Sequence, residues 1–135
     1  IIHSVERLPI SSVSAATALK VKDKEGGVYI FGNSNKGKAE IKGGQTFMGD
    51  LAVFAETKEK NILYLGNGEC VENNDFLVTC EKGMKGDVTL EYSDERLLIR
   101  SNVPIVVKIK NERIRGRLNL KKEIVYNQAA DEIFE

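Results

Sequence analysis

Short apolar runs bounded by turn residues recur along almost the whole chain. The most compact of these runs are residues 28–31, 51–56, 62–65 and 105–109. Clusters of glycine, asparagine and charged residues separate them, as expected for strands joined by tight turns. Residues 88–92 alternate strictly, so that Val88, Leu90 and Tyr92 share one face of an extended segment.

The pattern predicts very little helix. No segment keeps a period of 3.6 residues over three turns, and the best helical candidates, residues 12–19 and 128–134, are both short. Strands repeating at a spacing of roughly 8–12 residues are typical of a sandwich or barrel. We therefore predict an all-β fold, an antiparallel β-sandwich of about ten to twelve short strands. Residues 1–135 would form one domain, which we expect to be a fragment of a longer protein because the chain starts with Ile1.

One short motif occurs twice. Residues 49–54 read Gly-Asp-Leu-Ala-Val-Phe and residues 86–91 read Gly-Asp-Val-Thr-Leu-Glu, and a charged loop leads from each into another apolar run. This similarity indicates a repeated hairpin, which is a sign of regular sheet construction more than of a functional repeat.

The overall charge is balanced, with 20 Lys and Arg against 20 Asp and Glu. A general nucleic-acid binder needs a large basic excess, so we predict no nucleic-acid partner, although a local basic patch remains compatible with the composition. No apolar stretch is long enough to cross a membrane.

Few residues could support catalysis. His3 is the single histidine and lies near a chain end, and no glycine-rich loop precedes a helix. The spacing of Cys70 and Cys80 fits no zinc motif, and the two are either free thiols or one disulfide between neighbouring strands. Residues 73–75 are turn residues or, alternatively, calcium ligands. We predict no catalytic residue, no metal site and no cofactor in this domain.

Basic side chains alternate with apolar ones near the C-terminal end. The basic residues of this pattern are Lys108, Lys110, Arg113, Arg115, Arg117 and Lys121. If residues 113–121 are extended, the last four of these share one face of a strand. Such a face could hold an anionic glycan through bidentate guanidinium contacts, or it could be a solvent-exposed strand protected from aggregation by its charge.

Residues 48–109 resemble the C-terminal β-sandwich region of polysaccharide lyases of the heparinase II/III kind. The segments that carry this resemblance are Gly49-Asp50-Leu51-Ala52-Val53-Phe54, Ile62-Leu63-Tyr64-Leu65-Gly66-Asn67-Gly68, Phe76-Leu77-Val78 and Ser101-Asn102-Val103-Pro104-Ile105-Val106-Val107. These motifs are structural, and none of the catalytic motifs of such lyases can be matched in this chain.

The resemblance implies a non-catalytic accessory domain of a secreted or periplasmic bacterial enzyme that degrades acidic polysaccharides. Its partners would be the catalytic domain of the same parent chain and, through the six basic residues, the acidic polysaccharide. The alternative function is a structural or adhesive module of a secreted or surface protein. An exposed apolar patch or an unpaired strand edge would favour protein contact, and a concave basic surface would favour glycan.

Overall fold

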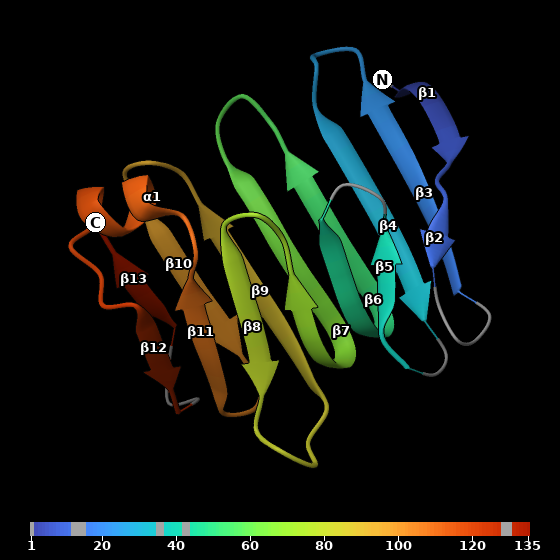
Figure 1. Cartoon of the computed structure of the whole chain (residues 1–135). Helices are drawn as coiled ribbons and strands as arrows, with labels where there is room; N and C mark the ends of the chain where they lie inside the picture. Colours follow the sequence, from blue (N-terminus) through green and yellow to red (C-terminus); the bar gives the residue numbers. More distant parts are fainter. Residues whose placement is uncertain (1, 12–15, 35–36, 42–43, 128–130) are drawn as a thin grey trace.

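A hairpin of two twelve-residue strands, β6 (Gln45–Glu56) and β7 (Asn61–Glu72), runs through the centre of the molecule (Figure 1). The computed structural model describes residues 2–11, 16–34, 37–41, 44–127 and 131–135. Within these residues thirteen strands form one hydrogen-bonded network in which all pairings between strands are antiparallel. The all-β antiparallel prediction is therefore confirmed.

The remaining strands form two layers that share this hairpin. Besides the hairpin, the first layer contains β1 (Ile2–Arg7), β3 (Ala16–Asp23), β4 (Val28–Ser34), β9 (Gly86–Tyr92), β10 (Leu97–Ser101) and β13 (Glu132–Phe134). Besides the hairpin, the second layer contains β2 (Ile10–Ser11), β5 (Ala39–Ile41), β8 (Phe76–Cys80), β11 (Ile105–Ile109) and β12 (Glu123–Tyr126). The first layer has the order β1-β3-β4-β6-β7-β9-β10-β13, and the second has the order β2-β5-β6-β7-β8-β11-β12.

The two layers pack face to face. The rings of Phe76 in β8 and Tyr92 in β9 lie 4.6 Å apart in an edge-to-face contact, although these two strands do not pair. On the other side of the hairpin, the ring of Phe47 lies so close to Gly32 of β4 that an added Cβ there would be 2.5 Å from it. Only glycine permits this approach of the β4 backbone to the ring.

Alternation along each strand builds the core between the layers. In β8, β9, β10 and β11 every second side chain is buried. The largest side chains with under 2% exposure include Phe47, Phe76, Leu63, Leu65 and Leu90. They belong to one hydrophobic cluster, which is the arrangement expected when each sheet turns one pleated face to the other.

The repeated Gly-Asp motif lies where the hairpin passes between layers. The pairing of β6 with β7 shifts register after Met48, and the pairing of β7 with β9 shifts between Leu65 and Gly68. Asn67 sits in this irregularity with a φ of 46°. Its side-chain amide donates to Asp50 at 2.7 Å, and its backbone N–H donates to Asp87 at 2.8 Å. The aspartates of both motifs thus hold the same left-handed residue.

The helical predictions were wrong for the residues that the structure describes. In the segment 12–19, residues 16–19 belong to β3, and in the segment 128–134 the last three residues form β13. Residues 12–15 and 128–130 lie outside the described residues. A helix occurs instead at Glu112–Arg117, labelled α1, and it is the sole helix of the described residues.

Substitution of Asn67 tests the hydrogen bonds at the point where the β6–β7 hairpin passes between the layers. Asn67→Ala removes the bond to Asp50 and places a Cβ-bearing residue without a polar side chain in the left-handed region, and we expect it to lower the free energy of unfolding by about 2 kcal/mol. Asn67→Gly removes only the side-chain bond, so it should cost about half as much. Urea denaturation followed by circular dichroism measures both, and equal effects of the two variants would contradict this account.

Candidate functional site

The segment that carries three of the predicted arginines is a helix and not a strand. Asn111 caps α1, and its side-chain oxygen accepts hydrogen bonds from the backbone N–H groups of Arg113 and Ile114. Ile114 and Leu118, four residues apart, are both buried. The predicted extended face of residues 113–121 is therefore wrong, because the apolar spacing serves a helix.

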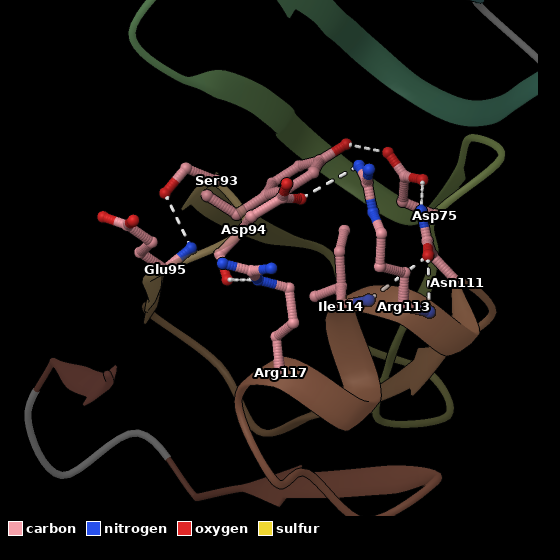
Figure 2. Close-up of polar contacts among 9 residues, drawn as sticks. Asp75, Ser93, Asp94, Glu95, Asn111, Arg113, Ile114 and Arg117 are labelled. Carbon is pink, nitrogen blue, oxygen red and sulfur yellow. Dashed lines mark hydrogen bonds and ion pairs between the residues drawn. The ribbon is translucent and has the colours of Figure 1, made fainter.

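Helical geometry divides the arginines between two directions. Arg113 and Arg117 are one turn apart and both reach the β9–β10 turn, as Figure 2 shows. The guanidinium of Arg113 pairs with the Asp94 carboxylate at 3.0 Å, and Nε of Arg117 donates to the Asp94 carbonyl oxygen at 3.4 Å. Arg115 instead pairs with Glu112 at 2.7 Å.

The lysines of the predicted surface are separated as well. Lys108 projects from β11 and lies 3.8 Å from Glu123. Lys110 donates to the Glu72 carboxylate at 2.7 Å, and this hydrogen bond is the main reason why the pKa of Glu72 is lowered. Within the part of the chain that the structure describes, Lys121 makes no hydrogen bond or ion pair. Four of the six predicted basic side chains are thus paired with a carboxylate, and the six form no common strand face.

A hydrogen-bonded network centred on Asp75 lies beside α1. Its carboxylate accepts from the Tyr92 hydroxyl at 2.6 Å and from the Asn111 side-chain amide at 2.8 Å. Burial, followed by the hydrogen bond to Asp75, raises the pKa of Tyr92 far above its ordinary value, so the hydroxyl stays a donor. The Asn73 side chain accepts from the backbone of Asp75 and Phe76 and donates to Tyr92 at 3.0 Å.

These contacts show residues 73 and 75 acting as turn residues. Both carboxylate oxygens of Asp75 and the side-chain oxygen of Asn73 already accept hydrogen bonds from the protein. Among the residues that the structure describes, no group of three or more His, Cys, Asp or Glu side chains could hold a metal ion.

A cleft of about 390 Å³ opens between the two layers next to this network. Val28, Ile30 and Phe54 of the first layer supply apolar surface, and residues 73–75 of the β7–β8 turn form part of the opposite wall. The volume is within the usual range of small-molecule sites.

The outer face of the first layer is apolar over most of its width. Strand register aligns one row across all eight strands: Val5, Val21, Tyr29, Ala55, Ile62, Glu91, Leu98 and Ile133. The neighbouring row contains Leu19, Phe31, Val53 and Tyr64. We call these two rows the outer apolar face. Glu91 is the one acidic residue among them, and it pairs with Lys60 at 3.3 Å.

Several side chains of this face are open to solvent. Val5 is 56% exposed, Ile133 50%, Leu19 43% and Phe31 37%. The outer face of the second layer is different, because Lys108, Glu123, Glu72 and Thr79 alternate there with apolar residues. An isolated sandwich would normally present polar side chains on both outer faces.

Sequence reasoning did not find the outer apolar face, although a signal was present. Residues 28–31, 52–55 and 62–65 are uninterrupted apolar runs, which are typical of strands covered on both faces. The exposed ends of the rows, Val5 and Ile133, lie in β1 and β13, which are edge strands with polar neighbours. Val5 and Ile133 belong to the face only because of the register in which β1 pairs with β3 and β13 pairs with β10. This register cannot be read from the sequence.

Cysteine and histidine offer no reactive pair among the described residues. Cys70 and Cys80 are both free thiols, and burial raises the pKa of Cys80 to about 11. Cys80 is buried and donates to the Gly68 carbonyl oxygen at 3.3 Å, which is the behaviour of a structural thiol. His3 is exposed in β1.

Comparison of the chain with models of protein families, with curated proteins and with solved structures finds no match. Among the described residues, none of the helical structure has the length and apolar character that a membrane span needs.

Removing one hydroxyl tests the Asp75 network. We expect Tyr92→Phe to lower the free energy of unfolding by about 1–3 kcal/mol, because a half-buried carboxylate loses a donor. Tyr64→Phe is the matched control, since the Tyr64 hydroxyl makes no hydrogen bond within the described part of the chain, and its effect should stay within about 0.5 kcal/mol. Urea denaturation of the two variants decides, and similar effects would show that the Tyr92 hydroxyl bond is not stabilising.

Proposed function

We propose that this chain is a non-catalytic β-sandwich module that packs through its outer apolar face against another folded domain of its parent protein. The observation that carries the proposal is the apolar row that crosses all eight strands of the first layer. Exposed contiguous apolar surface of more than a few hundred Å² is uncommon on isolated domains and marks interaction sites.

Burial explains why such a face favours a stable contact. Covering one large side chain of the face that is now about half exposed would stabilise the contact between the domains by on the order of 1 kcal/mol. Few charges oppose this, because the acid within the rows, Glu91, already has a cationic partner in Lys60. Arg7 and Arg100 lie at the two ends of the second row, and Thr89 lies next to Arg100. The four residues between Arg7 and Thr89 are apolar or aromatic.

The resemblance to heparinase II/III lyases supports a specific partner. It makes the partner the catalytic domain of a secreted or periplasmic enzyme that degrades acidic polysaccharides. In this proposal the module stabilises the catalytic domain and supplies no catalytic residue. The alternative function, an adhesive module of a secreted or surface protein, would use the same face against a separate protein.

Thiol labelling tests whether the outer apolar face is covered in the parent protein. In a Cys70→Ser background, Leu19→Cys and Phe31→Cys should react readily in the isolated chain. In the intact parent protein we expect their reaction to be slowed about tenfold or more, because the partner domain covers them. Mass spectrometry of the labelled peptides measures the rates.

Val125→Cys is the matched control, since Val125 is 63% exposed on the outer face of the second layer. It should react at the same rate in both proteins. Equal rates for positions 19 and 31 in the isolated chain and in the parent protein would refute packing against a domain of that protein. Slowing that appears only when a separate protein is added would support the adhesive alternative.

Contact with acidic glycan is the second part of the proposal. The groups available for it are the Arg113 guanidinium, whose side chain is 68% exposed, together with Arg115, Arg117, Lys108, Lys110 and Lys121. Because carboxylates accompany four of these six, a glycan must compete with internal ion pairs, and we infer weak, salt-sensitive binding.

Retention on a heparin column tests this contact. Arg113→Ala combined with Arg115→Ala should elute at lower salt than the unsubstituted chain, because two guanidinium groups are lost. Lys22→Ala combined with Lys24→Ala removes the same charge from the distant β3–β4 hairpin and should change retention less. Unchanged retention of the double arginine variant would remove acidic glycan from the proposed function.

A further inference from the structure

The cleft between the layers has a fixed wall. The Asn73 side chain accepts from two backbone N–H groups of its own turn, and the Asn73 carbonyl oxygen accepts from Nζ of Lys110 at 2.8 Å. The Asp75 carbonyl oxygen accepts from the backbone N–H of Lys110 at 2.7 Å. The turn is therefore tied to Tyr92 and to the segment before α1, so it needs little ordering when a ligand binds.

Polar side chains without protein partners line the same cleft. Within the described part of the chain, the side chains of Lys20, Gln45, Glu56 and Asn74 make no hydrogen bond or ion pair with another residue, and all four line the cleft. They supply an ammonium donor, a carboxylate acceptor and two amides that both donate and accept. Convergence of such groups on a partly apolar cleft is the usual construction of a small-molecule site.

We propose that this cleft binds one neutral sugar residue. A sugar ring has hydroxyl groups that donate and accept along its edge, which matches the mixed set of Lys20, Gln45, Glu56 and Asn74. It also has an apolar C–H face, which matches the surface of Val28, Ile30 and Phe54. The four polar groups of this site belong neither to the outer apolar face nor to the six basic residues, although Ala55 and Ile62 border both the cleft and that face. The sugar proposal therefore does not rest on the proposed function.

The charge of the cleft favours a neutral ligand over an acidic one. Glu56 and Asp75 line it with two carboxylates, and Lys20 is the one cation among its lining residues. A uronic acid or sulfated sugar would therefore meet net repulsion at close range. The acidic glycan of the proposed function belongs outside the cleft.

Titration of the ¹⁵N-labelled chain with single sugars tests the site. The probes are methyl glucoside, methyl galactoside, methyl mannoside and N-acetylglucosamine, with glucuronate as the anionic comparison. We expect at least one neutral probe to give saturable shifts of the amides of Ile30, Asn74 and Asp75, with a dissociation constant of about 1 mM. Glucuronate should bind at least about tenfold more weakly.

Two variants assign the binding to the cleft. Asn74→Ala and Glu56→Gln each remove or change one unpartnered group, and each should weaken binding of the neutral probe about tenfold. Asn127→Ala is the control, because Asn127 is exposed and does not line the cleft. The unaffected part of the spectrum reports that each variant is folded. No saturable shift with any neutral probe up to about 50 mM, shifts elsewhere only, or stronger binding of glucuronate would overturn the proposal.

Discussion

Both layers depend on the passage of one hairpin from the first to the second. Each strand of this hairpin belongs to both layers. β6 pairs with β4 in the first layer and with β5 in the second, and β7 pairs with β9 in the first layer and with β8 in the second. The irregular register around Gly49 and Asn67 makes this change of plane possible. Because the two layers are joined covalently through this hairpin, the inner faces that form the core are brought together by the chain itself.

The two outer faces of the sandwich are chemically unequal, and this asymmetry is the strongest functional signal in the molecule. The second layer alternates Lys and Glu with apolar residues, as solvent-exposed sheets do. The first layer is apolar on both faces across its central strands β4, β6 and β7. These three strands do not alternate apolar and polar side chains, and this is the pattern expected of strands that are covered on both faces.

Much of the fold could be predicted from local pattern, because alternation and turn residues act over a few positions. The strand of residues 88–92 and the all-β class are examples, and the strand of each Gly-Asp motif forms a hairpin with the next strand. The motifs nevertheless lie at irregularities of register and not in a regular part of the sheet. The segment from Arg113 onward was predicted wrongly, because Ile114 and Leu118 fit a period of two and a helical spacing at once. Leu120 fits only the period of two and lies beyond α1. Asn111, followed by an acidic residue, was the available sign of a helix start.

The apolar runs of the central strands were a sign of the outer apolar face. The full extent of the candidate sites could not be predicted, because they join residues that are distant in sequence. The row from Val5 to Ile133 exists only through seven strand registers. The pairing of Arg113 with Asp94, and the gathering of Lys20 and Asn74 around one cleft, depend on how hairpins lie across each other. Contacts of this kind cannot be inferred from composition or from the spacing of residues along the chain.

The carboxylate of Asp75 connects the cleft with the N-terminal cap of α1. One oxygen holds Tyr92 at the cleft, and the other holds the amide of Asn111, whose own oxygen caps α1. A molecule that drew Asp75 toward the cleft would therefore weaken the support of the helix cap, and a contact that tightened the helix would restrain Asp75. By thermodynamic linkage the two events would change each other's affinity by the same factor.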